Sequence, residues 1–138
     1  MTLTGPALSD APADEIFRLA TRGDARDTDQ ILTEAGAPPA RLAYLDPPYN
    51  SGRHFGSYSD AMDRQEWVAM ITQTLQSVRS VMRLDGSVWL QIDGQVEHLV
   101  RLTMDEVFGP GNNIGSITWQ RKERAAFLHA QMATVTVT

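Results

Sequence analysis

Apolar residues recur every three to four positions along two stretches of the chain, and this spacing predicts two amphipathic helices. The first helix begins at Asp63, which forms a capping-box pattern with Glu66, and Asp85-Gly86 is expected to end it and turn the chain. The second helix begins near Val96 and is closed by Gly109-Pro110-Gly111. The apolar positions of the first helix are Trp67, Met70, Ile71, Leu75, Val78, Val81 and Met82.

Three other stretches have the patterns of strands. The continuous apolar run Leu42-Ala43-Tyr44-Leu45 is typical of a strand that is buried on both faces of a parallel sheet. Residues 87–92 alternate in polarity and residues 114–120 form a third candidate strand. A short helix is expected from Thr28 to Ala35, with Gly36 in the usual position for ending it.

The order of these elements is strand, helix, strand, helix, strand. That order predicts an α/β fold built on a parallel sheet. Ligands of such sheets bind at the carboxyl ends of the strands. Asp46 directly follows the first strand, so it is expected at that edge of the sheet.

Composition limits the class of protein. The 138 residues are 42% hydrophobic, which is typical of a folded domain, and we expect a flexible leader over 1–13 followed by one domain over 14–138. There is no cysteine, no apolar stretch of bilayer length and no secretory pattern, so a cytoplasmic location without a membrane partner is expected. The histidines lack partners at metal-ligand spacing, so no metal site is predicted.

The run Asp46-Pro47-Pro48-Tyr49 combines groups that can hold an amino group on a nucleic-acid base. The Asp46 carboxylate and the Pro47 carbonyl can each accept one amino hydrogen, and the two prolines hold that carbonyl in place. Tyr49 offers a flat face for stacking on a base that has left the duplex. The plainer interpretation is a turn at the end of a strand, since Asp-Pro-Pro is also common in loops.

The longer run Asp46-Pro47-Pro48-Tyr49-Asn50-Ser51-Gly52 resembles the catalytic motif of DNA adenine-N6 and cytosine-N4 amino-methyltransferases. The resemblance extends over roughly residues 15–124, which makes it far more specific than four residues. The flanking segments that match are Gly23-Asp24, Leu42 to Leu45, Leu84 to Asp93, Leu102 to Gly109 and Ile117 to Lys122.

This resemblance implies a partial, incomplete Rossmann-like sheet of the S-adenosylmethionine-dependent methyltransferases, parallel and with helices on both faces. It implies Asp46, Pro47, Pro48 and Tyr49 as catalytic residues and Asp24, Asp46, Pro47 and Asn50 as cofactor-binding residues. Gly23-Asp24 is equally consistent with an ordinary turn, and Asn50 with a turn residue.

The family's Phe-x-Gly-x-Gly cofactor turn does not occur in these residues. In the permuted β class, which includes the type III Mod-like adenine enzymes, the catalytic motif precedes that turn. The resemblance therefore implies a truncated or split β-class enzyme. A second chain that carries the cofactor motif and target recognition, or a homodimer, is an expected partner.

DNA is the substrate that the resemblance implies, and adenine is favoured over cytosine. The candidate DNA-binding residues are Arg53 and His54 beside the motif and Arg121 and Lys122 after the third strand. A solvated loop explains Arg53 and His54 at least as well, and surface charge is the commoner explanation for a cluster such as Arg121 and Lys122. The net charge of −5 argues against a wholly basic surface but leaves room for a local basic groove.

Two other functions remain open. The chain is alternatively a catalytically silent fragment that binds DNA or a partner chain. The other alternative is methylation of RNA or of a protein amide, because related Asp/Asn-Pro-Pro-Tyr motifs serve those substrates. The Asn50-Ser51-Gly52 extension favours DNA instead.

Overall fold

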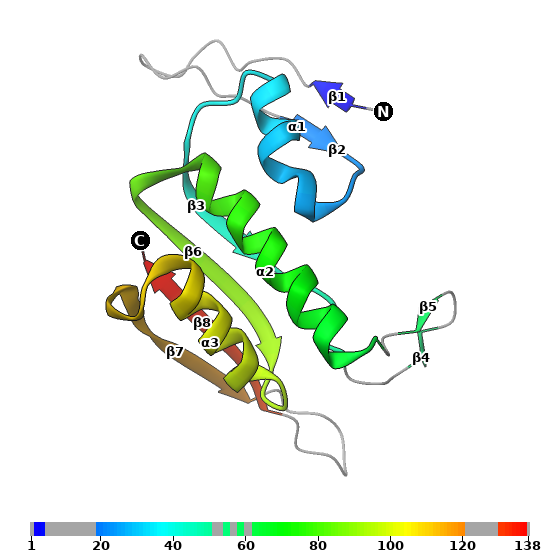
Figure 1. Cartoon of the computed structure of the whole chain (residues 1–138), viewed down its shortest axis with the longest axis vertical. Helices are drawn as coiled ribbons and strands as arrows, with labels where there is room; N and C mark the ends of the chain where they lie inside the picture. Colours follow the sequence, from blue (N-terminus) through cyan, green and yellow to red (C-terminus); the bar gives the residue numbers. More distant parts are fainter. Residues whose placement is uncertain are drawn as a thin grey trace.

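The computed structural model describes residues 2–4, 19–50, 54–55, 58–59, 62–120 and 130–137, with side chains over 19–50 and 62–118. A sheet carries two long helices, and a smaller N-terminal unit packs beside the first of them (Figure 1). The α/β class expected from the sequence is confirmed.

Helix α2 (Arg64–Val81) is the longest helix in the described part of the chain. Asp63 caps it as predicted, because its carboxylate accepts hydrogen bonds from the backbone N–H groups of Gln65 and Glu66. Its buried positions recur at the helical period and form one face, which is why this segment is helical and lies against the sheet. They are Trp67, Ile71, Thr74, Leu75, Ser77 and Val78.

Strands β3 (Ala40–Leu45) and β6 (Met82–Asp93) are paired in parallel, as predicted. The prediction that Asp85-Gly86 turns the chain is wrong, because α2 has already ended at Val81 and β6 runs through both residues. The register is irregular here, with Ala40 opposite Met82 but Leu42 opposite Ser87. Gly86 allows the close approach, since a Cβ there would lie 2.7 Å from the Met82 Cε and 3.2 Å from the Ala40 carbonyl oxygen.

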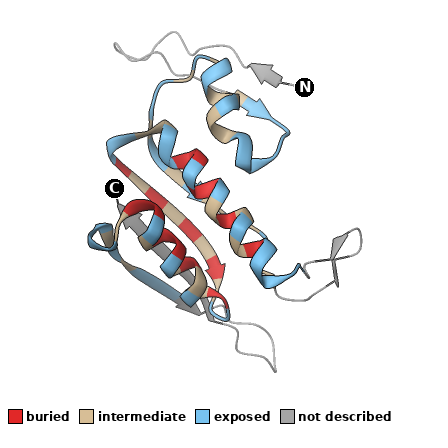
Figure 2. Cartoon of the chain, viewed as in Figure 1, coloured by how far each residue is buried: buried red, intermediate tan, exposed pale blue. Residues whose placement is uncertain are grey.

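Helix α3 (Glu97–Phe108) lies beside α2 on the same side of the sheet, and the core is formed between these helices and β6 (Figure 2). Val88, Leu90 and Ile92 alternate along β6 and point into this core. Gly109 follows α3 with a positive φ of 96°, in agreement with the predicted helix end. Among the described residues, the buried apolar side chains come from these two helices, one face of β6 and Val96 just before α3.

Strand β7 (Asn113–Gln120) agrees with the third predicted strand, but it is not the direct neighbour of β6. Strand β8 (Ala130–Val137) lies between them and is antiparallel to both, giving the order β3-β6-β8-β7. The C-terminal residues, to which the sequence patterns assigned no element, therefore supply an inner strand. The sheet is mixed, with β3, β6 and β7 running in one direction and β8 in the other.

The expected burial of β3 on both faces is wrong. Leu42 and Tyr44 are 60% and 58% exposed, whereas Ala43 and Leu45 pack against the core. The expectation of helices on both faces is corrected in the same way for the described residues, because α2 and α3 lie on one face (Figure 1). Within the described residues, the other face of β3 has no helix to cover it, so its apolar side chains meet solvent.

Helix α1 (Thr28–Glu34) matches the short helix that was predicted and follows a 3₁₀ turn, η1 (Ala25–Asp27). It is tied to α2 through Ser77, whose buried hydroxyl donates to the Asp29 carboxylate at 2.9 Å and accepts from the Asp29 backbone N–H at 2.8 Å. This bond holds the pKa of Asp29 below its usual value. It also fixes the first turn of α1 against the face of α2.

The remaining elements are short. β1 (Thr2–Thr4) pairs with β2 (Leu19–Thr21), so part of the predicted leader is a strand, and residues 5–13 lie outside the described part. β4 (His54–Phe55) pairs with β5 (Tyr58–Ser59), and a 3₁₀ turn, η2 (Pro110–Asn112), precedes β7. None of the described helices has the length and apolar character that spanning a membrane requires.

Candidate active site

The Asp-Pro-Pro-Tyr motif follows the last residue of β3 and lies at the carboxyl end of that strand, as predicted. Two contacts fix it to the start of α2. The indole Nε1–H of Trp67 donates to the Pro48 carbonyl at 2.8 Å, and the Asn50 side-chain oxygen accepts from the Met62 backbone N–H at 2.8 Å. Asn50 has a positive φ of 51°, a conformation that asparagine tolerates better than most residues. The motif and the residue after it are thus anchored to the start of α2, in addition to the rigidity of the two prolines.

Asp46 and Tyr49 are hydrogen-bonded to each other. The Tyr49 hydroxyl donates to the Asp46 Oδ1 at 2.8 Å and accepts from the Gln91 Nε2 at 2.7 Å. The Tyr44 hydroxyl donates in turn to the Gln91 Oε1. These four side chains form a connected polar cluster on the motif, contributed by β3, the motif itself and β6.

The environment of Tyr49 disfavours its ionisation. Desolvation of its half-buried ring, and the carboxylate of Asp46 beside its hydroxyl, raise the pKa of Tyr49 to about 12, against the opposing effect of the Gln91 hydrogen bond. Tyr49 therefore stays a neutral hydrogen-bond donor at neutral pH.

This raised pKa predicts a loss of stability at high pH. The folded protein holds the Tyr49 proton more tightly than the unfolded chain does. The contribution of protonated Tyr49 to the free energy of unfolding is therefore fully present below pH 10.0 and is lost as the pH rises through about 12. Urea unfolding measured between these values should show a steeper fall in the free energy of unfolding for the parent than for Tyr49→Phe. The control is Tyr58→Phe, which removes another phenol. Equal slopes for the parent and Tyr49→Phe would contradict the assignment.

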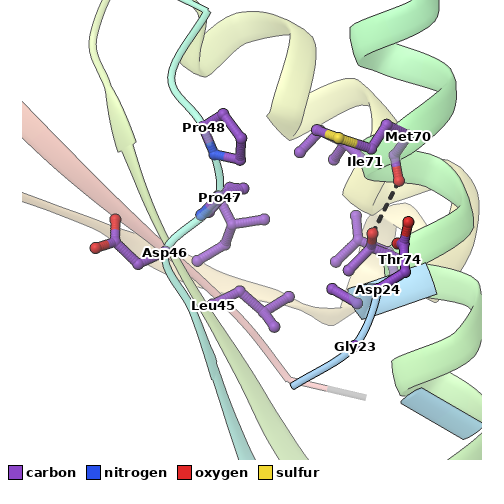
Figure 3. Close-up of a pocket in the computed structure, with 12 residues that line it drawn as sticks. Gly23, Asp24, Leu45, Asp46, Pro47, Pro48, Met70, Ile71 and Thr74 are labelled. Carbon is purple, nitrogen blue, oxygen red and sulfur yellow. Dashed lines mark hydrogen bonds between the residues drawn. The ribbon is translucent and has the colours of Figure 1, made fainter. Parts of the chain in front are cut away.

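A cavity of about 400 Å³ lies on the other side of the motif (Figure 3). Leu45 and Pro47 point into it, whereas the Asp46 side chain is directed away from it. The motif therefore separates two regions, with the cavity on one side and the polar cluster on the other. The cavity is lined by Gly23, Asp24, Ala25, Leu45, Asp46, Pro47, Pro48, Met70, Ile71, Thr74, Leu75 and Leu90.

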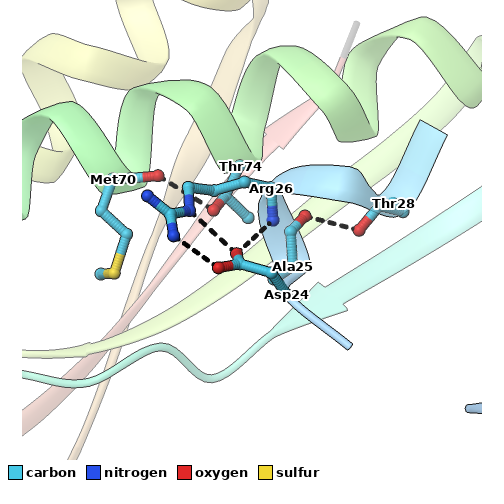
Figure 4. A network of polar contacts seen from close by, with 6 residues as sticks. All are labelled: Asp24, Ala25, Arg26, Thr28, Met70 and Thr74. Atoms are coloured by element: carbon cyan, nitrogen blue, oxygen red, sulfur yellow. Dashed lines mark hydrogen bonds and ion pairs between the residues drawn. The ribbon is translucent and has the colours of Figure 1, made fainter. Parts of the chain in front are cut away.

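Asp24 lies on the cavity wall opposite the motif. Its carboxylate accepts hydrogen bonds from the backbone N–H and the Nε–H of Arg26, each at 2.9 Å (Figure 4). The Arg26 side chain is the largest cause that lowers the pKa of Asp24 to about 2. A ligand that used Asp24 as an acceptor would share that carboxylate with Arg26.

The structure brings together some of the predicted site residues and leaves others undescribed. Asp24, Asp46 and Pro47 line one cavity, whereas Asn50 is not among the lining residues. Of the candidate DNA-binding residues, Arg53, Arg121 and Lys122 lie outside the described residues, and only the backbone of His54, in β4, is described.

Two contact residues of the motif were not assigned a site role from the sequence. The sequence pattern predicts Trp67 as a core position of an amphipathic helix, and at 1% exposed it is one. Its contact with the motif is a second role that the pattern does not indicate. Gln91 lies on the sheet face opposite the core, and only the strand register brings it to Tyr49. A buried indole needs a hydrogen-bond acceptor, so the Trp67 position carried a weak signal.

An α/β sheet with Asp-Pro-Pro-Tyr at a strand end, facing a cavity, defines the amino-methyltransferase class. The family model described as DNA methylase matches residues 40–134, more than half of the chain, so this chain belongs to that family of adenine-N6 and cytosine-N4 methyltransferases.

Similar proteins include a subunit of a restriction-modification enzyme and a type II methyltransferase. The EcoP15I Mod subunit, a type III restriction-modification enzyme of Escherichia coli, is 26% identical over 74% of this chain and 20% of its own length. The type II methyltransferase M.EcaI of Enterobacter cloacae is 31% identical over 57% of this chain and 19% of its own length. The chain thus spans about a fifth of the length of these relatives.

Proposed function

We propose that this chain supplies the base-holding half of an enzyme that methylates an exocyclic amino group in DNA, with adenine N6 favoured over cytosine N4. The observation that carries the proposal is the Asp46–Tyr49 pair at the carboxyl end of β3. The family match and the names of the relatives support the reaction and the substrate.

The amino group would be held by two acceptors of the motif. Trp67 already donates to the Pro48 carbonyl, so the Pro47 carbonyl is the backbone acceptor that we assign to the base. Tyr49 donates to one oxygen of Asp46, and the other carboxylate oxygen is assigned to the second amino hydrogen. Asp46 also favours the positive charge that develops on the amino nitrogen as it is methylated. The Tyr49 ring is proposed as the stacking face for the extruded base.

The cavity fits part of a cofactor such as S-adenosylmethionine. Its volume of about 400 Å³ lies within the usual range for small-molecule sites, and it combines an apolar lining with the carboxylate of Asp24. Asp24 and Pro47, with the backbone of Asp46, would hold the cofactor there, and Asn50 remains a further candidate. S-adenosylmethionine would supply the methyl group. The motif lies between the cavity and the polar cluster, and we propose the cavity side for the donor and the cluster side for the base.

A partner is proposed because the sheet is open at β3. In the described residues this strand pairs only with β6, and Leu42 and Tyr44 are exposed on its uncovered face. Unpaired edges and exposed apolar faces favour association. We propose a second chain, or a further part of the same protein, that carries the cofactor turn and target recognition; a homodimer is the other candidate.

The proposed contacts with DNA remain those expected from the sequence, namely Arg53, His54, Arg121 and Lys122.

Calorimetric titration of the chain with S-adenosylmethionine tests the proposal. We expect saturable heat that is weakened by Asp24→Asn and unchanged by Asp85→Asn, which alters a carboxylate paired with Arg83 away from the cavity. Absence of heat up to millimolar cofactor would favour the second candidate, a catalytically silent module that binds DNA or a partner chain. The exposed face of β3 is the observation that favours that candidate.

A further inference from the structure

The polar cluster beside the motif has one consistent arrangement of donors. The Gln91 Nε2 can only donate, so the Tyr49 oxygen must accept from it. The single hydroxyl proton of Tyr49 then points to the Asp46 Oδ1, because a carboxylate oxygen can only accept. The Gln91 Oε1 can only accept, so it takes the proton of Tyr44. Every donor in the chain from Tyr44 to Asp46 therefore points the same way.

The opposite orientation of the Gln91 amide would break this arrangement. Its oxygen would then face the Tyr49 hydroxyl and compete with Asp46 for the same proton. Two acceptors sharing one proton would leave the Asp46 carboxylate less firmly held. A series of hydrogen bonds that point in one direction also strengthens each of its members. The amide of Gln91 thus determines which way Tyr49 donates.

The strand register explains why Gln91 can do this. Tyr44 of β3 lies opposite Trp89 of β6, and Gln91 is two residues further along the same face. That position lies next to the carboxyl end of β3, where the motif begins. Asp46 is exposed, and a carboxylate at the surface would otherwise rotate freely. The sheet therefore provides a rigid support for a side chain that the loop alone would leave mobile.

We propose that Gln91 is a positioning residue for the Asp46–Tyr49 pair, and that it directs the Tyr49 hydroxyl onto one oxygen of Asp46 so that the other oxygen faces the target amino group. The first part concerns the folded chain alone, and the second rests on the function proposed above. Gln91 does not touch the base in this proposal. Tyr44 supports Gln91 from the neighbouring strand.

The test of the first part is NMR of the chain labelled with ¹³C at the hydroxyl-bearing carbon of tyrosine. The chain has three tyrosines, and Tyr44→Phe and Tyr49→Phe assign two of the resonances. Gln91→Leu should shift the Tyr49 resonance at neutral pH, because the hydroxyl loses a donor. Tyr44→Phe should shift it in the same direction, because the hydrogen-bonded path from Tyr44 to Tyr49 runs through Gln91. A purely structural role for Gln91 predicts no such transmitted shift.

Gln91→Glu provides a second variant of nearly the same shape. A carboxylate accepts but cannot donate, so the new Glu side chain should compete with Asp46 for the Tyr49 proton. The pKa of Tyr49 should then rise, because the Gln91 hydrogen bond that lowers it in the parent is lost. Gln73→Leu and Gln73→Glu make the same changes at an exposed position of α2 and should leave the Tyr49 resonance where it was. An unmoved Tyr49 resonance in folded Gln91→Leu and Gln91→Glu chains would overturn the proposal.

Binding of a single-stranded adenine-containing oligonucleotide tests the second part. We expect Gln91→Leu to weaken binding by about three- to tenfold, the effect of one lost hydrogen bond, with Gln73→Leu unchanged. Binding by the parent that Gln91→Leu does not weaken would overturn the role in base binding. If the parent itself does not bind, the proposed function fails, and the NMR shifts still decide whether Gln91 positions the pair.

Discussion

Asp46→Ala is expected to lower methyl transfer by about 10²- to 10³-fold, the size seen when one preorganised hydrogen-bonding group is removed from a catalytic site. The variant loses the acceptor for one amino hydrogen and the negative charge that stabilises the methylated nitrogen. It also leaves the Tyr49 hydroxyl without the partner that it has at 2.8 Å. Because Asp46 is exposed, the free energy of unfolding should change by less than about 1 kcal/mol.

The measurement is transfer of a labelled methyl group from S-adenosylmethionine to an adenine-containing duplex. It is made with the chain alone and with the chain mixed with a partner that carries a Phe-x-Gly-x-Gly turn. Asp46→Asn should retain more activity than Asp46→Ala, because its amide oxygen still accepts one hydrogen bond. Glu106→Ala, an exposed carboxylate on α3, is the control. Parental activity in Asp46→Ala would contradict the proposed mechanism.

Features that depend on local pattern were predicted well. The helical period of apolar residues located α2 and α3, and the capping role of Asp63 was correct, because both arise from neighbours within one helix. The prediction let α2 continue as far as Asp85-Gly86, whereas it ends at Val81. Nothing in the local sequence separates a helix that ends at Val81 from one that continues to Leu84, and the pairing of β6 with β3 decides it.

Features that depend on distant partners were predicted only in part: the parallel pairing of β3 with β6 was expected, but other pairings were not. Strand β8 inserts between β6 and β7, and its Thr- and Val-rich end favours a strand without indicating which strands it joins. The burial of β3 was overestimated, because an apolar run does not reveal whether a second layer covers it. The motif itself was recognisable from consecutive residues, whereas the contact of Gln91 with Tyr49 joins residues 42 positions apart and requires the register.

Trp67 is expected to give the largest change in stability, because it serves the core and the motif at once. Its side chain is 1% exposed, and its indole N–H donates to the Pro48 carbonyl at 2.8 Å. Trp67→Ala removes a buried aromatic ring and should lower the free energy of unfolding by about 3–5 kcal/mol. Single domains are stable by about 5–15 kcal/mol, so this variant should lose a large share of its stability.

Trp67→Phe separates the two roles of this residue. It keeps an aromatic ring in the core but cannot donate to Pro48, and the loss of that hydrogen bond costs about 0.5–1.5 kcal/mol. Urea unfolding followed by circular dichroism measures the loss, and Trp89→Phe on the opposite sheet face is the matched control. The Trp67→Phe chain should also hold the Tyr49 hydroxyl less firmly on Asp46, seen as a broadened or shifted Tyr49 resonance. A stability loss without any change at Tyr49 would mean that the indole supports only the core, and that the prolines and Asn50 are sufficient to hold the motif.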